Sequence, residues 1–145
     1  IKNCQSALEI MAKLQTQDSQ NEEINRFTSQ TERWNSKILI KLGRGIEVIT
    51  NIEKSLEKVE KQSAASPTDK LVYFQIGEIK LQLGYAYKTL ADKTKNQTDR
   101  KKSCEYFQTT YKMYQEFVDS GYSGAAAFNE TELAQFQNEI KSCGQ

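Results

Sequence analysis

The amino-acid types that most often carry chemistry are sparse in this chain. It contains no histidine, which removes the commonest general base and the commonest metal ligand. Asp and Glu together number 19, and they fall on the outer faces of predicted helices or at helix starts, as is typical of solvated charge. The cysteines are Cys4, Cys104 and Cys143, and none of them belongs to a C-x-x-C motif. We therefore predict no catalytic residue, no metal ligand and no cofactor.

Cationic side chains gather at one place in the sequence. This basic cluster consists of Lys93, Lys95, Arg100, Lys101 and Lys102. Two interpretations stay open: a site for phosphate, a phosphorylated partner or an anionic surface, and a solvated loop that leads into a helix. Cations at a helix start interact unfavourably with the helix dipole, and a placement that costs stability is consistent with a role in binding. The formal net charge of the whole chain is only +1, which argues against a protein dedicated to nucleic acid.

Helices must position these side chains, because apolar residues recur at helical spacing along almost the whole chain. The 145 residues are typical of a single domain, 1–145. No apolar run reaches the ~18 residues that membrane insertion needs. The chain starts at Ile1 rather than at Met, so we expect it to be a piece of a longer protein. About six helices are predicted, grouped as a partial unit 1–15, a hairpin 21–62, a hairpin 69–119 and a C-terminal capping helix 129–143.

Local signals predict where several helices begin. The second helix should start near Asn21, and the last helix should have Asn129 as its N-cap. For the fourth helix, Ser66 suits the N-cap and Pro67 the first helical position. A polar loop at 93–99 is expected to separate the fourth and fifth helices.

Each helix also has a stripe of apolar residues that should face the core. In the second helix the stripe is Ile24, Phe27, Trp34, Ile38 and Leu42. The stripes of the next three helices are Ile49, Ile52, Leu56 and Val59; Val72, Ile76, Ile79, Leu83, Ala86 and Leu90; and Cys104, Phe107, Tyr111, Tyr114 and Val118. Reflecting the second and third helices about Gly43–Gly45 puts Trp34 opposite Leu56, so we expect Trp34 to be buried.

The stripes of the last two helices predict an antiparallel hairpin with a turn near residues 122 and 123. Reflection about that turn places three pairs in contact: Phe107 with Ile140, Tyr111 with Phe136, and Tyr114 with Leu133. It also brings Cys104 beside Cys143. Two outcomes stay open for these cysteines, a disulfide in an oxidising compartment and a pair of buried thiols elsewhere. The compartment therefore stays open between cytoplasmic and, if the bond forms, extracytoplasmic.

Two segments of the chain repeat. Leu42-Gly43 and Leu83-Gly84 follow a small residue, Ser36 or Gly77, at the same spacing. With Ile76-Gly77 and Ala7-Leu8, these positions resemble tetratricopeptide (TPR) repeats. The run from Ile76 through Cys104 to Cys143 is similar to the C-terminal helical region of bacterial serine/threonine kinases that carry TPR repeats. The resemblance implies an all-α fold of stacked antiparallel helical hairpins that forms a right-handed superhelical fragment.

In such a stack the first helix of each hairpin lines a concave groove. The residues expected to line it are Arg33, Lys37, Lys41, Tyr73, Lys80 and Tyr87. This arrangement predicts a non-catalytic module or scaffold that binds a protein or peptide as part of a larger protein. The alternative is a closed helical-bundle sensor domain that binds a small ligand between its helices. The oligomeric state is left open.

Overall fold

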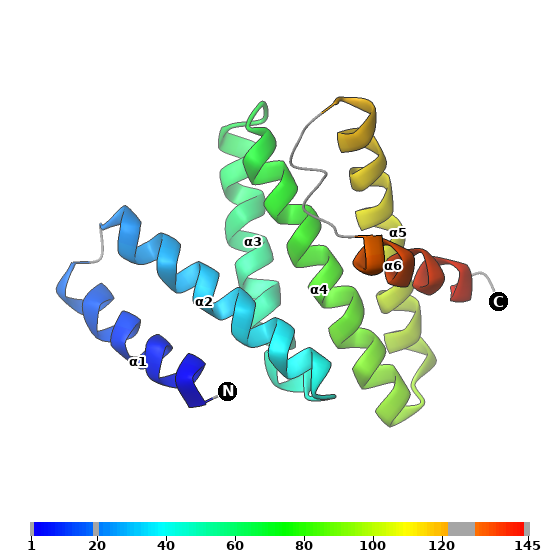
Figure 1. Ribbon diagram of the computed structural model, residues 1–145, viewed down its shortest axis with the longest axis horizontal. Helices are drawn as coiled ribbons and strands as arrows, with labels where there is room; N and C mark the ends of the chain where they lie inside the picture. The colour runs from blue at the N-terminus through cyan, green and yellow to red at the C-terminus, as the bar shows by residue number, and fades with distance from the viewer. Residues whose placement is uncertain (1, 19–20, 122–129, 144–145) are drawn as a thin grey trace.

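The computed structural model describes residues 2–18, 21–121 and 130–143, which form helices joined by short turns (Figure 1). The helices are α1 (Lys2–Gln17), α2 (Glu22–Lys41), the short 3₁₀ helix η1 (Gly45–Val48), α3 (Ile49–Ala65), α4 (Lys70–Thr94), α5 (Gln97–Asp119) and α6 (Glu130–Ser142). Within these ranges there is no β-strand. The fold is therefore all-α, as the sequence predicts.

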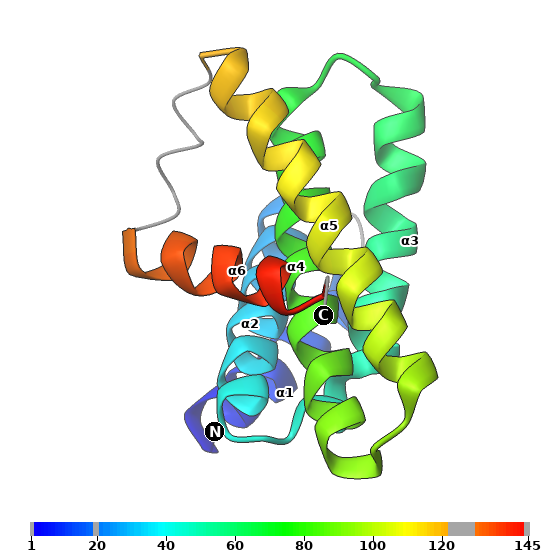
Figure 2. The ribbon, with the colours of Figure 1, turned by 90° about the vertical axis from the view of Figure 1, so that its right-hand side faces the viewer.

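Helix α4 occupies the centre of the fold. It packs against α3 on one side and α5 on the other, and each of these neighbours runs antiparallel to it (Figures 1 and 2). Helices α1 and α2 form a separate antiparallel pair. Of this pair α2 contacts α4, and η1, which follows α2, contacts both α2 and α4. The predicted pairing of helices within 69–119 is confirmed. The hairpin predicted at 21–62 is wrong, because α2 packs against α1, η1 and α4 and does not pair along its length with α3.

Side-chain caps set the starts of three helices. The Asn21 carboxamide oxygen accepts hydrogen bonds from the backbone N–H groups of the first turn of α2, as predicted. The Asp69 carboxylate does the same for α4, at 2.9 and 3.2 Å, so α4 starts at Lys70 and the predicted Ser66 cap is wrong. Asn96 caps α5, which leaves only residues 95 and 96 outside the helices where a loop was predicted at 93–99. The predicted Asn129 cap lies outside the described residues.

The hydrophobic core joins residues of α2, η1, α3, α4 and α5. The predicted stripes of α3 and α4 are confirmed, and their most enclosed residues include Ile52, Leu83 and Ala86. Gly84 lets α5 approach closely, because a Cβ atom there would lie 2.7 Å from the ring of Phe107. Next to this contact the Ser103 hydroxyl donates a 2.8 Å hydrogen bond to the Gly84 carbonyl oxygen. The stripe of α5 is shifted from the prediction: Phe107 is buried, but Val118 is 50% exposed while the preceding Phe117 is 5% exposed.

Of the five apolar residues predicted to face inward on α2, three are exposed, and Ile24 and Ile38 are half-buried. Trp34 and Leu42 are both 58% exposed and Phe27 is 41% exposed. The inner face instead carries Thr28 and Leu39, together with Ser36. The physical reason is the change of partner: since α1, η1 and α4 rather than α3 cover α2, its buried face is rotated around the helix axis. The predicted contact of Trp34 with Leu56 is accordingly wrong.

Helix α6 crosses α5 steeply instead of running antiparallel beside it (Figures 1 and 2). Its one fully buried side chain among the described residues is Phe136, which contacts Tyr111 with ring centroids 5.9 Å apart, as predicted. Phe136 also packs against Phe107 at 6.1 Å, where an antiparallel hairpin would place Ile140. The crossing gives α6 one point of apolar contact with α5 rather than a continuous seam.

Among the described residues, none of the helices combines the length and the hydropathy needed to cross a lipid bilayer.

Candidate functional site

A cleft of about 300 Å³ opens between α2, α4 and α6. Helix α4 forms its floor, α2 forms one wall and α6 covers one end. The residues that line it are Lys37, Ile40 and Lys41 of α2; Phe74, Glu78, Leu81, Gln82, Tyr85, Lys88, Thr89 and Asp92 of α4; and Gln135 and Glu139 of α6. The volume lies at the lower end of the range of sites that hold small molecules or anchoring side chains. We call this feature the α2–α4–α6 cleft.

The cleft has an apolar floor and a charged rim. Leu81 and Tyr85 of α4 are half-buried in the floor. On the rim, Lys37 lies 3.8 Å from Glu78, and Lys88 forms an ion pair with Glu139 of α6. Lys41 has no ion-pair partner within the described part of the chain, and its side chain is exposed. The cleft can therefore hold an apolar group while Lys41 offers a cation to its outer end.

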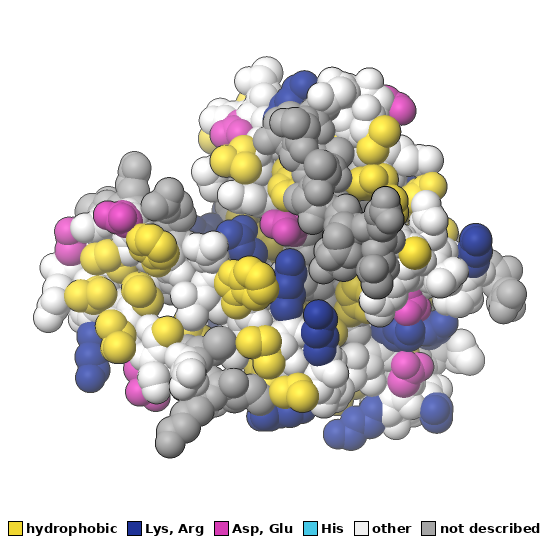
Figure 3. Space-filling model, viewed as in Figure 1, with side chains coloured by type: hydrophobic (Ala, Val, Ile, Leu, Met, Phe, Trp, Pro, Cys, Tyr) yellow, Lys and Arg dark blue, Asp and Glu magenta, His cyan; other side chains and the backbone are white. Residues whose placement is uncertain are grey.

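The outer surface of α2 continues the cleft. Trp34, Ile38 and Leu42 follow one another at a spacing of four residues, and so form one row along the helix. Lys37 and Lys41 form a parallel row on the side toward α4, and the Lys37 ammonium lies 5.7 Å from the centre of the Trp34 ring. Figure 3 shows hydrophobic side chains gathered over α1 and α2 on this face, with Lys and Arg side chains near the junction of α2 and α4. We call the two rows the α2 face.

The six residues predicted to line one groove do not come together. Lys37 and Lys41 line the α2–α4–α6 cleft. Arg33 instead lines a smaller pocket that also reaches α1 and α3. The remaining three residues, Tyr73, Lys80 and Tyr87, project from another side of α4 toward α3 and α5. A single groove lined by all six is therefore wrong, because the residues of α4 face a different direction from those of α2.

The three α4 residues serve as cross-links between helices. Lys80 pairs with Glu60 of α3 at 3.1 Å, the Tyr73 hydroxyl donates to Glu116 of α5 at 2.6 Å, and the Tyr87 hydroxyl donates to Glu53 of α3 at 2.6 Å. Burial raises the pKa of Tyr73 to about 12, with a further contribution from its hydrogen bond to the Glu116 carboxylate. Burial and the hydrogen bond to Glu53 also raise the pKa of Tyr87. Both phenols therefore stay protonated at neutral pH and act as donors.

The basic cluster is likewise dispersed. The Arg100 guanidinium donates to the hydroxyl of Ser142 in α6 at 3.2 Å. Lys102 lies over the ring of Tyr87 with its ammonium 5.0 Å from the ring centre. Lys93 lies in the last turn of α4, Lys95 adopts a left-handed backbone conformation after it, and Lys101 is exposed on α5. Two cations of the cluster therefore contact different neighbours, Arg100 the end of α6 and Lys102 a ring of α4.

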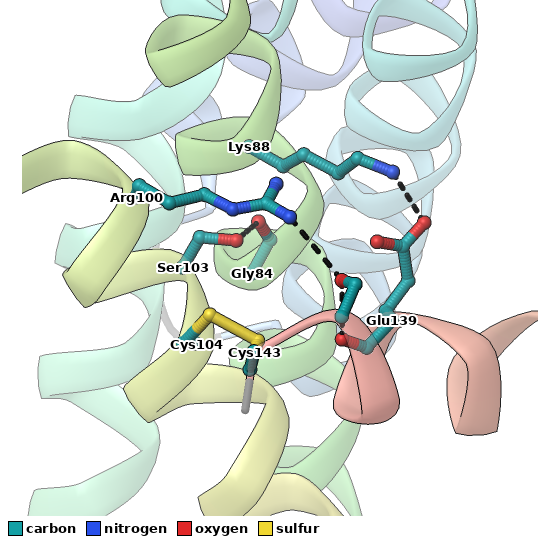
Figure 4. The surroundings of a disulfide bond; sticks show 8 residues. Gly84, Lys88, Arg100, Ser103, Cys104, Glu139 and Cys143 are labelled. Carbon is teal, nitrogen blue, oxygen red and sulfur yellow. Dashed lines mark hydrogen bonds and ion pairs between the residues drawn. A yellow bond between two sulfur atoms is a disulfide. The ribbon is translucent and has the colours of Figure 1, made fainter. Parts of the chain in front are cut away.

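A disulfide joins Cys104 of α5 to Cys143, the residue after α6, with a Cα–Cα distance of 5.5 Å (Figure 4). Of the two outcomes that the sequence left open, the structure has the bond. Figure 4 shows the Lys88–Glu139 pair and the contact of Arg100 with the end of α6 beside it. These contacts fix the C-terminal half of α6, and α6 in turn supplies Gln135 and Glu139 to the α2–α4–α6 cleft.

In comparisons with known proteins, no family model, no curated protein and no solved structure matches the chain. The resemblance to TPR repeats therefore stays a prediction.

Sequence reasoning missed the α6 contribution to the cleft. Glu139 and Gln135 sit on the last helix, which was expected to pair with α5 alone. The acidic residues of the last helix were assigned to solvent because nothing in their spacing shows that α6 crosses toward α4. One available signal was Lys88, a cation in the middle of the central helix, which needs an acidic partner when it is half-buried.

Proposed function

We propose that this chain is a non-catalytic protein-binding module whose docking surface is the α2 face together with the α2–α4–α6 cleft. The observation that carries the proposal is the outward position of Trp34, which is 58% exposed in a row with Leu42 at the same exposure. Large apolar side chains that follow one another along a surface helix are typical of interaction sites. Tryptophan is moreover among the residues that most often dominate the binding energy of an interface.

The partner that suits this surface is an acidic amphipathic helix of another protein. Its apolar side would pack on Trp34, Ile38 and Leu42 and place one anchoring side chain in the cleft. Its carboxylates would meet Lys37, whose ammonium lies 3.8 Å from Glu78, and Lys41, which forms no ion pair within the described residues. Helix-in-groove recognition of this kind uses anchors three, four and seven residues apart.

The TPR-like stack with a right-handed superhelix belongs to this proposal and rests on the sequence resemblance. The adjacent antiparallel pairs α1–α2 and α3–α4 are compatible with it. A scaffold role within a longer protein follows from the same resemblance.

Trp34 is the only tryptophan, so its fluorescence reports directly on the docking surface. The probe is a synthetic peptide of about 15 residues, long enough for a marginal helix, with leucines on one side and glutamates flanking them. Binding should shift the Trp34 emission to shorter wavelength in a saturable manner. A peptide in which lysine replaces each glutamate should bind at least about tenfold more weakly, the equivalent of roughly 1.4 kcal/mol.

Charge reversal on α2 tests the same surface from the protein side. The double variant Lys37→Glu, Lys41→Glu should lose the acidic peptide. The matched control is Lys54→Glu, Lys58→Glu, an equally spaced pair of exposed lysines on α3, which should bind it unchanged. The proposal fails if the two double variants behave alike. It also fails if sedimentation shows that a second copy of the chain already covers Trp34.

The sensor-domain alternative is favoured by a different observation, the pocket of about 90 Å³ between α1, α2, α3 and α4 that Arg33 lines.

A further inference from the structure

Helix α6 closes one end of the α2–α4–α6 cleft. Its residues Gln135 and Glu139, which lie four positions apart and so share one face of the helix, line the cleft. The Glu139 carboxylate forms an ion pair with Lys88 of α4, and the Glu139 side chain is only 12% exposed (Figure 4). A carboxylate of this chain therefore already neutralises a lysine of the cleft.

Aromatic contacts continue from the floor of the cleft to α6. The ring of Tyr85 in the floor lies 5.0 Å from the ring of Phe107 of α5, measured between centroids, and the Phe107 ring lies 6.1 Å from that of Phe136. Phe107 is 1% exposed. Because Phe136 packs on Phe107, departure of α6 would expose part of this ring and would extend the apolar floor beyond Tyr85.

The composition of α6 matches that of the partner proposed above, and this inference rests on that proposed function. Helix α6 contains three glutamates and one lysine, which give it a formal charge of −2. Phe136 is its large apolar anchor, and Glu139 contacts a lysine of the cleft. An acidic amphipathic helix is therefore already seated at one end of the cleft, where it occupies Lys88 and the apolar surface next to Tyr85.

The Cys104–Cys143 disulfide is the one covalent restraint on this helix within the described residues. Phe136 is the one fully buried side chain of α6 in the same part of the chain, and the C-terminal half of α6 adds the Glu139 ion pair and the hydrogen bond from Arg100. A helix of 13 residues is marginal on its own, so without the disulfide its position depends on these contacts. Both cysteines are half-buried rather than enclosed, which leaves the bond within reach of a small thiol.

We propose that α6 is a lid over the α2–α4–α6 cleft, that the Cys104–Cys143 disulfide is its latch, and that reduction by a dithiol opens the cleft to an acidic amphipathic helix. A thiolate of the dithiol attacks one sulfur, and the other cysteine leaves as a thiolate that takes up a proton. The second thiol of the reductant then displaces the first cysteine from the mixed disulfide. The reductant ends as a disulfide, and two electrons and two protons have passed to Cys104 and Cys143.

Opening of the lid changes the charge that the cleft presents. Departure of Glu139 removes a carboxylate that repels an acidic partner, and it leaves Lys88 without its ion pair. Lys88 then joins Lys37 and Lys41, which line the same cleft. The partner can place a carboxylate on Lys88 and an apolar side chain on Phe107, as α6 does when the lid is closed. Since the closed chain still exposes the α2 face, the lid changes the affinity for the partner rather than allowing or forbidding binding.

The test measures the affinity of the acidic leucine peptide for the natural chain before and after treatment with dithiothreitol, by Trp34 fluorescence. Reduction should tighten binding by at least about fivefold, the equivalent of roughly 1 kcal/mol. The double variant Cys104→Ser, Cys143→Ser should bind as tightly as the reduced chain and should not respond to dithiothreitol. Hydrogen exchange should show that α6 loses protection on reduction while α4 keeps it.

A variant with the latch intact tests the lid contact by itself. Glu139→Gln frees Lys88 and removes the carboxylate of the lid, so this variant in its oxidised form should bind the peptide about twofold more tightly, as is typical of one ion pair near the surface. The matched control is Glu105→Gln, which removes an exposed carboxylate of α5 outside the cleft and should leave binding unchanged. Because both variants keep the disulfide, they decide the matter even if the cysteine variant does not fold.

The outcomes separate the lid from the docking surface. If the oxidised chain binds the peptide and reduction leaves the affinity unchanged or weaker, the docking surface stands and the lid is overturned. Binding that is tighter after reduction, or seen only then, supports the lid. If neither form binds, the docking surface fails and the lid fails with it. Unchanged hydrogen exchange of α6 after reduction also overturns the lid, as do equal affinities of Glu139→Gln and Glu105→Gln.

Discussion

Loss of the Cys104–Cys143 disulfide should destabilise the protein by about 4 kcal/mol. The two cysteines are separated by 39 residues along the chain. Closing a loop of that length removes roughly 13 cal/mol/K of entropy from the unfolded chain, which corresponds to about 4 kcal/mol at 25 °C. The apolar contact that holds α6 is weaker, since burial of Phe136 contributes ~1.5–3 kcal/mol.

The comparison uses the double variant Cys104→Ser, Cys143→Ser, measured by urea unfolding beside the natural chain. The control is Cys4→Ser, which keeps the bond and should unfold at the natural midpoint. Hydrogen exchange should show α6 losing protection before α4 in the double variant, since α6 then depends on one apolar contact. Thiol counting on the denatured, unreduced chain should find one free thiol of the three cysteines. A loss below about 1 kcal/mol, or an equal loss in Cys4→Ser, would refute the reasoning.

Three further predictions follow from single side chains. Trp34→Ala should lower the free energy of unfolding in urea by less than about 1 kcal/mol, because Trp34 is 58% exposed. Leu39→Ala should lower it by ~2–5 kcal/mol, because Leu39 is 7% exposed. A Trp emission maximum typical of a buried ring would contradict the exposed position of Trp34. Asp69→Ala should cost ~1 kcal/mol through loss of the α4 cap, and Asp69→Asn much less, as judged by thermal melting. Because the pKa of Tyr73 is raised to about 12, its contribution to stability is complete below about pH 10 and is lost as the pH rises toward 12. Tyr73→Phe should therefore flatten the decline of the urea midpoint across that interval, and an unchanged decline would show that Tyr73 does not cause it.

The sequence predicts the central helices well because their patterns have a single interpretation. The stripe Val72, Ile76, Ile79 and Leu83 recurs at helical spacing, and all four side chains are buried. The start of the second helix near Asn21 could be predicted because acidic residues follow it. In contrast, Ser66-Pro67 is a common helix start, and the sequence does not show that the Asp69 side chain caps α4 instead.

The face of α2 could not be predicted from hydrophobicity, since its largest apolar side chains face solvent. The buried face carries Thr28 and Ser36, whose small size permits close packing, and Leu39 is its one large apolar member among the buried residues. A hydrophobic stripe has the same pattern whether it faces the core or a partner. The smaller pocket that Arg33 lines was hidden for a related reason: Asn35 and Gln82 line it together only because α2 packs on α4, a pairing that the predicted hairpin 21–62 does not contain.

The central position of α4 has a consequence for how the chain acquires its structure. Helices α3 and α5, which cover most of α4, are its immediate neighbours in the sequence. Their contacts close only short loops, and folds dominated by such local contacts assemble rapidly. We expect α3, α4 and α5 to collapse together first. The α1–α2 pair would then dock through α2 and η1, and α6 would arrive last. Until oxidation joins Cys104 to Cys143, the newly made chain would therefore exist as a folded core on which the final helix docks and undocks.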